Sequence, residues 1–101
     1  MNQLTEISQF RLEKAAYILK AVAHPLRLAV LELLSSNEKM GVTEICEVLN
    51  CEQSLMSHHL ITMKLKGILG STKDGLNVFY WLKTKEVITL ISCIENCECN
   101  M

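Results

Sequence analysis

Three cysteines close to the C-terminus are the side chains of this sequence best suited to chemistry. Cys93 and Cys97 are four positions apart, so they would share one face of a continued helix, and Cys99 is near enough to supply a third sulfur. Three thiolates without a histidine suit a soft, thiophilic ion, whereas magnesium or calcium prefers oxygen ligands. Trivalent arsenic or antimony, which favours three sulfur ligands, is the natural candidate. The pattern therefore predicts a metalloid site at Cys93, Cys97 and Cys99.

Two alternatives use the same thiols. Cys97 and Cys99 lie in a polar, acidic tail in which packing does not require sulfur, and exposed thiols are open to oxidation. A reversible disulfide or persulfide among the three cysteines therefore stays open. Zinc, cadmium or lead would recruit a fourth donor, for which the sequence offers Glu95, Glu98 and Cys46.

Length and composition limit the class of protein. With 101 residues the chain forms one domain, small enough that a second copy would add much buried surface. The N-terminus lacks the features of a signal peptide and no apolar run could cross a bilayer, so we expect a cytoplasmic protein. Five cysteines in such a chain favour metal binding or redox sensing over a disulfide framework. An enzyme is not expected, because there is no glycine-rich phosphate loop and no histidine near the tail cysteines.

Charge is unevenly distributed along the chain. The formal net charge is −1, which by itself does not indicate a nucleic-acid partner. Residues 53–85, however, carry five lysines and one aspartate, a local charge of +4, whereas residues 1–52 and 86–101 carry −2 and −3. The middle of the chain is therefore the electropositive part that could approach nucleic acid.

Apolar periodicity predicts the order of the secondary-structure elements. Helical spacing extends over residues 4–22 and stops at His24-Pro25, because proline disfavours helix for the residue before it and suits the first position of the next helix. Further helices are expected over 25–34, 43–50, 53–67 and 85–96. Between the last two, short β-branched and aromatic stretches flank Asp74-Gly75, a sequence typical of a β-hairpin.

The short helix over 43–50 is expected to turn Ile45, Val48 and Leu49 inward. Cys46 lies on the apolar side of the same helix, where it fits the role of a small buried hydrophobe. Cys51 falls in the turn that follows. We interpret Cys51 as incidental, and the sequence leaves the roles of both cysteines open.

The order of helix, helix, helix-turn-helix, hairpin and helix is that of a winged helix-turn-helix DNA-binding module. The segments HPLRLAVLELL, VTEICEVLN, QSLMSHHLITMKLKGIL and KDGLNVFYWL resemble the ArsR/SmtB family of bacterial metal-responsive repressors, over nearly the whole chain. The most specific marks are HPLR and an S-x-x-S-x-H-L pattern at Ser54, Ser57, His59 and Leu60. The expected fold is thus mainly α with a small β-hairpin, with residues 1–96 as the DNA-binding and dimerisation domain and 97–101 as a cysteine-containing tail.

The fourth predicted helix carries small and polar side chains at its N-terminal end, where they could meet base edges, and lysines near its C-terminal end, where they could meet the phosphate backbone. His59, beside Leu60, also fits a hydrogen-bonded structural role, and His58 is the more exposed candidate. In the family a pair of basic residues usually flanks the glycine of the hairpin, whereas here Lys73 and Asn77 do so. We therefore expect DNA contacts from Gln53, Ser54, Ser57, His58, His59, Lys64, Lys73 and Asn77.

A homodimer is expected for two reasons. The first and last helices carry more apolar positions than one thin domain could cover, and such modules usually recognise operators with two-fold symmetry. The resemblance implies the same dimer. The expected interface consists of Leu4, Ile7 and Leu12 of the first helix and Val87, Leu90, Ile91 and Ile94 of the last.

Three inducer sites known in the family are absent from this sequence. A Cys-x-Cys pair on the third helix would occupy Gly41 and Thr43, and neither is a cysteine. A zinc site of aspartate and histidine on the last helix lacks its histidine, and a cysteine switch between the second and last helices lacks its first cysteine. The C-terminal cysteine cluster remains, and it resembles that of some arsenic-responsive members.

The function expected from these observations is that of a repressor that binds double-stranded operator DNA as a dimer, without an obligatory cofactor. Arsenite or another thiophilic ion would release it by binding the C-terminal cysteines. The alternative within the same fold is a repressor that senses redox state or persulfide. A different class, a metal-buffering or redox protein whose helix-turn-helix serves only for packing, would show negligible sequence-specific DNA binding.

Overall fold

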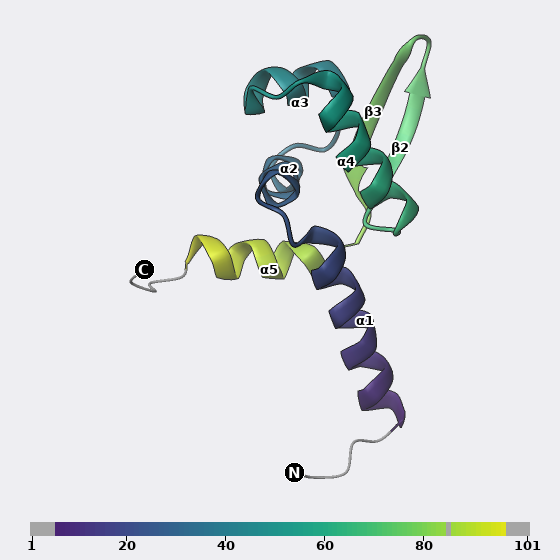
Figure 1. Cartoon of the computed structure of the whole chain (residues 1–101), viewed down its shortest axis with the longest axis vertical. Coiled ribbons are helices and arrows are strands. Elements are labelled where there is room, and N and C mark those ends of the chain that lie inside the picture. Colours follow the sequence, from purple (N-terminus) through teal and green to yellow (C-terminus); the bar gives the residue numbers. More distant parts are fainter. Residues whose placement is uncertain (1–5, 85, 97–101) are drawn as a thin grey trace.

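A computed structural model describes residues 6–84 and 86–96 of the chain. The elements in chain order are α1 (Glu6–Val22), α2 (Pro25–Ser35), β1 (Met40–Gly41), α3 (Val42–Leu49), α4 (Gln53–Leu65), β2 (Leu69–Asp74), β3 (Asn77–Leu82) and α5 (Glu86–Glu95). The helices α2, α3 and α4 and the sheet form the body, from which α1 and α5 extend (Figure 1). None of the described helices is long and apolar enough to cross a membrane. The expected order of helices and hairpin is confirmed.

The boundary between α1 and α2 lies where proline was expected to place it. Pro25 is the first residue of α2, and the extended His24 caps the helix by accepting a hydrogen bond from the Leu26 amide at Nδ1, over 3.0 Å. A side-chain acceptor at this position satisfies one of the amides that a helix N-terminus leaves unpaired. The His24-Pro25 pair therefore both ends one helix and starts the next.

The sheet has three antiparallel strands in the order β1-β3-β2. Strands β2 and β3 form the expected hairpin, with Asp74 opposite Asn77 and Gly75 at φ +66° in its turn. Strand β1, which no pattern in the sequence predicts, pairs Met40 with Tyr80 and ends the loop after α2. Two residues are too few to show an alternating pattern, so only the tertiary structure reveals this strand.

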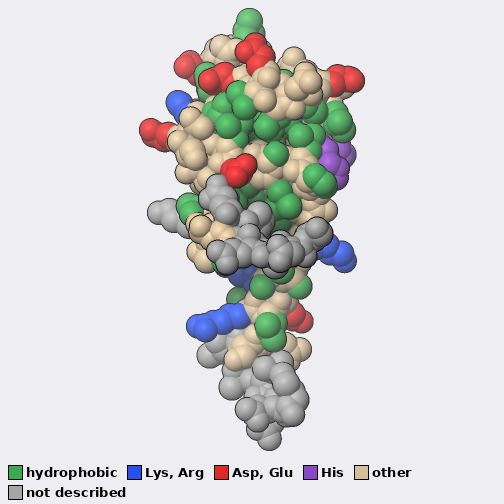
Figure 2. Space-filling view, turned by 90° about the vertical axis from the view of Figure 1, so that its left-hand side faces the viewer, with side chains coloured by type: hydrophobic (Ala, Val, Ile, Leu, Met, Phe, Trp, Pro, Cys, Tyr) green, Lys and Arg blue, Asp and Glu red, His purple; other side chains and the backbone are tan. Residues whose placement is uncertain are grey.

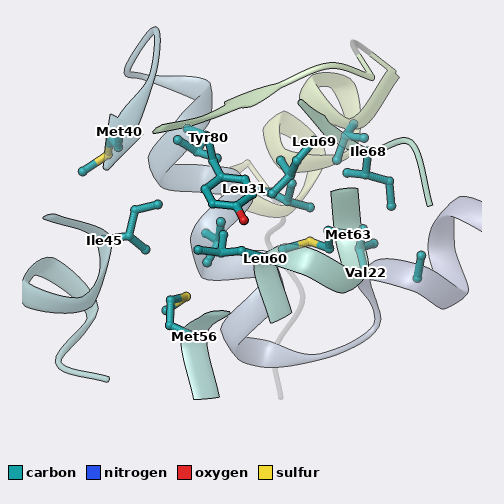
Figure 3. Packing of buried hydrophobic residues seen from close by; sticks show 14 of the residues in the cluster. Val22, Leu31, Met40, Ile45, Met56, Leu60, Met63, Ile68, Leu69 and Tyr80 are labelled. Carbon is teal, nitrogen blue, oxygen red and sulfur yellow. The ribbon is translucent and has the colours of Figure 1, made fainter. Parts of the chain in front are cut away.

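The core lies where α2, α4 and the sheet meet. Met56, Leu60 and Met63 are fully buried on one face of α4. In Figure 3 they point into a cluster that also contains Leu31 of α2 and Tyr80 of β3. This packing fixes which face of α4 remains available to solvent.

Two expectations about apolar faces are wrong. Val48 was expected to face inward but is 59% exposed, because α3 buries Ile45 and leaves the opposite side to solvent. Val87 and Ile91 were expected at the dimer interface, yet both are buried in the core of their own protomer. The face of α5 that carries them packs against the body, and α5 contacts α2.

Candidate nucleic-acid interface

The helix-turn-helix consists of α3 and α4, joined by residues 50–52. Asn50 adopts the left-handed conformation (φ 49°, ψ 56°), and the Cys51 amide donates a hydrogen bond to the Cys46 carbonyl over 3.1 Å. A hydrogen bond of this kind, from the sixth residue of a turn back to the first, commonly ends a helix. Asparagine tolerates the left-handed region better than most residues. Glu52 occupies the N-cap position of α4 without a side-chain hydrogen bond to the helix amides, and its carboxylate accepts a hydrogen bond from the Ser54 hydroxyl. The turn thus sets where α4 begins.

The N-terminal end of α4 presents the polar side chains that the sequence predicted for DNA contact. Gln53, Ser54 and His58 are exposed and Ser57 is half-buried. A groove of about 480 Å³ lies between this end of α4, the start of α3 and the β2–β3 hairpin, which is the wing of the fold. Gln53, Ser57 and Asn77 line this groove together. Residues from two separate elements therefore converge on one surface. Their expected contacts with bases are not tested by this geometry.

The expected basic residues are exposed but do not line this groove. Lys64 is exposed in the last turn of α4, and Lys73 is exposed on β2, opposite Val78 of β3. Both positions suit contacts with the phosphate backbone rather than with base edges. At the tip of the wing, Leu76 is almost fully exposed.

A different face of the molecule lacks this polar character. Figure 2 shows hydrophobic side chains gathered over the upper body, with acidic side chains around their rim. A surface of this kind would repel phosphate, since like charges near the backbone of DNA are unfavourable. The groove between α4 and the wing is therefore the better candidate for nucleic acid.

His59 is a correction to the predicted DNA-binding set. Its side chain is only 5% exposed, so its ring cannot reach a base edge. Instead, Nδ1 accepts a hydrogen bond from Arg27 Nε over 2.9 Å, and Arg27 Nη1 donates to the Ala21 carbonyl over 2.8 Å. The alternative weighed from the sequence, a hydrogen-bonded structural histidine beside Leu60, is the one that the geometry supports.

The surroundings of His59 favour its neutral form. Burial lowers the pKa of His59, and the neighbouring His24, Arg27 and His58 lower it further. The ring centroids of His24 and His59 are 4.5 Å apart. Because Nδ1 accepts the hydrogen bond from Arg27, the neutral ring carries its proton on Nε2, which has no hydrogen-bond partner within the described part of the chain.

These contacts explain in physical terms why two sequence motifs occur together. In HPLR, His24 caps α2 and Pro25 is its first residue. Arg27 donates one hydrogen bond to the Ala21 carbonyl of α1 and another to His59, the histidine of S-x-x-S-x-H-L on α4. The two motifs, about 30 residues apart in sequence, therefore form one contact that fixes α4 relative to α1 and α2.

Comparison with known proteins identifies the family. The family model described as "Bacterial regulatory protein, arsR family" matches residues 24–70, which include both motifs. The HTH-type transcriptional regulator YgaV of Escherichia coli is 32% identical over 98 residues, covering 95% of this chain and 99% of that protein. The chain belongs to the ArsR family. The transcriptional repressor PagR of Bacillus anthracis is also 33% identical over 90 residues, covering 89% of this chain and 90% of that protein.

Solved structures of the family have the same fold. The structure of reduced HlyU from Vibrio cholerae superimposes with a TM-score of 0.82 at 30% identity, covering 95% of this chain and all of that chain. This ArsR-family chain is therefore a winged helix-turn-helix regulator of transcription that binds DNA. The family and its relatives are regulators rather than enzymes, as the sequence analysis expected.

The predicted metalloid site is described only in part. The Cys93 side chain is exposed near the end of α5, whereas Cys97 and Cys99 lie outside the described residues. Glu98, one possible fourth donor, also lies outside them. Within residues 6–84 and 86–96, no group of three or more His, Cys, Asp or Glu side chains is arranged to hold a metal ion. The three-cysteine site stays a prediction.

The predicted dimer surface is also described in part. Leu4 and the side chains of Ile7 and Ile94 lie outside what is described, while Leu12 is 54% exposed and Leu90 is half-buried. The sequence analysis missed three large exposed side chains of α1 as interface candidates: Phe10, Tyr17 and Leu19. Helical spacing marked α1 as apolar, but only the structure shows that large apolar side chains on α1 stay exposed, although Lys66 lies over the Tyr17 ring.

Proposed function

We propose that this ArsR-family chain is a homodimeric repressor that leaves its operator when a thiophilic metalloid, with arsenite as the first candidate, binds the thiols of Cys93, Cys97 and Cys99. The observation that carries the proposal is the exposed Cys93 thiol near the end of α5, four residues before Cys97. An exposed thiol of this kind is accessible to an inducer, and three sulfurs match the preference of trivalent arsenic.

The dimer follows from the exposure of α1. Phe10, Leu12, Tyr17 and Leu19 are each at least half exposed. At about 100° per residue, Phe10 and Tyr17 share one face of α1, and Leu12 and Leu19 share the opposite face. Large apolar side chains exposed on a helix that extends from the body are unfavourable in water and mark surfaces for association. A second copy is the natural partner, because two-fold symmetry would place two α4 helices on successive major grooves.

The contacts of the protomer support a route by which a change at Cys93 would reach the DNA-binding helix. Ile91 of α5 is buried and lines one cavity with Pro25 and Leu28 of α2. Arg27, on the same helix α2, holds His59 of α4. A ligand that draws Cys93 toward the tail would shift α5, and α2 would pass part of that shift to α4. Coupling of about 1–3 kcal/mol between the two sites is the usual scale of such control.

Repression rather than activation is the finer part of the proposal. It is supported by the relative PagR, which is described as a transcriptional repressor. The relative HlyU of Vibrio cholerae is described as a transcriptional activator, so the direction of control requires its own measurement. A reporter gene behind the upstream DNA of this chain would rise on deletion of the chain if the proposal is correct.

The test is fluorescence anisotropy of the reduced protein on its own upstream DNA, titrated in parallel with arsenite, zinc, cadmium and an organic polysulfide. We expect release by arsenite, and we expect Cys97→Ser to keep the DNA affinity but lose most of the response. Glu98→Gln is the matched control in the same tail, and it should respond to arsenite as the parent does, because three sulfurs complete the arsenic site without a carboxylate. Release by polysulfide alone would assign the thiols to redox sensing, and an unchanged response in Cys97→Ser would refute the assignment of the site.

A further inference from the structure

The turn of the wing carries a leucine that takes no part in the core of the protomer. Asp74 pairs with Asn77, so Gly75 and Leu76 alone form the turn between β2 and β3. Gly75 is at φ +66°, as a two-residue turn with glycine in its first position requires. Leu76 is 99% exposed, more than any other large apolar side chain in the described part of the chain. Burial within the protomer therefore gives no reason for an apolar side chain at this position.

Leu76 lines the same groove as the polar side chains of α4. Gln53 and Ser57, four residues apart, line the groove from α4, and Leu76 and Asn77 line it from the wing. In Figure 1 the turn is the free end of the hairpin, beyond the helices of the body. DNA with its major groove on the N-terminal end of α4 would bring the neighbouring phosphate backbone, and then the adjacent minor groove, toward the wing. The turn is therefore the part of the wing that would reach the minor groove.

The charge of the turn does not favour phosphate at its tip. Asp74 is exposed and negative, whereas Gly75, Leu76 and Asn77 are uncharged. A phosphate placed directly at the turn would be repelled by the Asp74 carboxylate. The floor of the minor groove consists of uncharged base edges, and its width of about 6 Å admits a narrow turn with one apolar side chain. The chemistry of the turn thus suits base edges in the minor groove better than the DNA backbone.

We propose that Leu76 is a specificity-determining residue that enters the minor groove of the bound DNA and selects A·T over G·C pairs there. In the minor groove a G·C pair differs by the 2-amino group of guanine, which is a hydrogen-bond donor. Against a leucine this donor would lose water and gain no acceptor, which is unfavourable. An A·T pair has no such group, so it leaves room for the apolar side chain. The inference rests on the proposed contact of α4 and the wing with operator DNA.

Asn77, the next residue, would strengthen the same preference. Its side chain is exposed and lines the groove beside Leu76. The amide of asparagine donates hydrogen bonds, and the minor-groove edge of an A·T pair offers only the acceptors adenine N3 and thymine O2. Leu76 excludes the guanine amino group, and Asn77 can pair with the acceptors that remain. In a dimer the two wings would impose this preference at two symmetric positions of the operator.

The experiment uses the full chain and three versions of one DNA site. The protein first selects its preferred sites from a pool of random duplexes, and we expect A·T pairs beside the positions that α4 contacts. Fluorescence anisotropy then measures the affinity for the selected site and for versions with G·C or inosine·cytosine at those A·T positions. Inosine lacks the 2-amino group, so its pair with cytosine resembles G·C in the major groove and A·T in the minor groove. G·C should weaken binding about tenfold, and inosine·cytosine should restore most of the affinity.

Two variants of the leucine and one matched control complete the test. Leu76→Ala has too short a side chain to reach the base edges, and Leu76→Asn supplies an acceptor for the guanine amino group. Both should reduce the preference for A·T over G·C from about tenfold to about twofold or less. Leu65→Ala is the control, because Leu65 at the end of α4 is also a leucine with 80% exposure but does not line the groove. It should keep the full preference.

The outcomes separate this inference from the proposed function. An unchanged preference in Leu76→Ala would overturn the role of Leu76 and leave the repressor and its response to arsenite intact. A loss with inosine·cytosine as large as that with G·C would also overturn it, because the pair would then be read in the major groove. Selection of no preferred sequence by the parent would overturn both the inference and the proposed repressor.

Discussion

The guanidinium of Arg27 on α2 donates a hydrogen bond to Nδ1 of the buried His59 on α4, over 2.9 Å, and also binds the Ala21 carbonyl at the end of α1. One side chain thereby joins three helices, of which α4 carries the candidate DNA-binding surface. A hydrogen bond from a charged donor in a largely buried position is stronger than an exposed one. The position of α4 therefore depends on residues that do not face DNA.

The first prediction concerns stability. Replacing His59 by alanine removes a buried ring and leaves the Arg27 donor without its acceptor. We expect the free energy of unfolding to fall by about 3 kcal/mol, the scale for losing a buried side chain and its hydrogen bond. Urea unfolding followed by circular dichroism measures this loss. His58→Ala is the matched control, and because His58 is exposed its effect should stay within about 0.5 kcal/mol. Equal losses in the two variants would contradict the structural role of His59.

The second prediction concerns pH. The pKa of His59 is lowered in the folded protein, chiefly by burial, from its ordinary value of 6.5. The unfolded chain therefore binds more protons at mildly acidic pH than the folded chain does. The stability that neutral His59 contributes is present above pH 6.5 and is lost progressively as the pH falls below it toward the folded pKa.

Urea unfolding of the parent and of His59→Gln between pH 5 and pH 8 tests this dependence, a range set about the histidine pKa. The parent should lose stability on acidification, and the glutamine variant should lose less over the same interval. Parallel curves for the two proteins would show that His59 does not titrate between the folded and unfolded states as its burial implies.

Much of the fold could be predicted because local physics dictates it. The His24-Pro25 pair sets a helix boundary through the geometry of proline, and Asp74-Gly75 sets the hairpin turn through the left-handed preference of glycine. The strand β1 could not be predicted, since its two residues become a strand only by pairing with β3. Local patterns specify elements that are long or sharply turned, and tertiary contacts specify the rest.

The errors at the candidate sites have a common cause. The apolar face of α5 has the same helical spacing whether it packs in its own core or against a second copy, so Val87 and Ile91 were assigned to the wrong surface. His58 and His59 are adjacent and chemically identical, and only their three-dimensional positions separate an exposed candidate from a buried structural residue. Sequence patterns indicate that a side chain is buried or polar, but not which partner it meets.

The third prediction concerns the two lysines expected to contact the phosphate backbone. Lys64→Ala and Lys73→Ala should weaken binding to all DNA sequences alike, because phosphate contacts carry no sequence information. In a dimer each variant removes two contacts, so the slope of log affinity against log salt should fall in magnitude by about 2. Fluorescence anisotropy over a series of salt concentrations measures the slope. Lys20→Ala, on exposed α1, is the control and should leave the slope unchanged. A slope that stays constant in Lys73→Ala would place the wing away from the DNA backbone.

The last prediction concerns the dimer. Leu12 lies on α1 among the large exposed apolar side chains, at 54% exposure. Leu12→Glu would place a charge within the proposed interface, where losing an anchor and burying a carboxylate together cost several kcal/mol. We expect a shift from dimer to monomer at micromolar concentration in sedimentation velocity, and loss of operator affinity because a monomer contacts only half of a two-fold site. Val48→Glu is the matched control, since Val48 on α3 is apolar and 59% exposed but lies outside the proposed interface. A dimer that survives Leu12→Glu would move the interface away from α1.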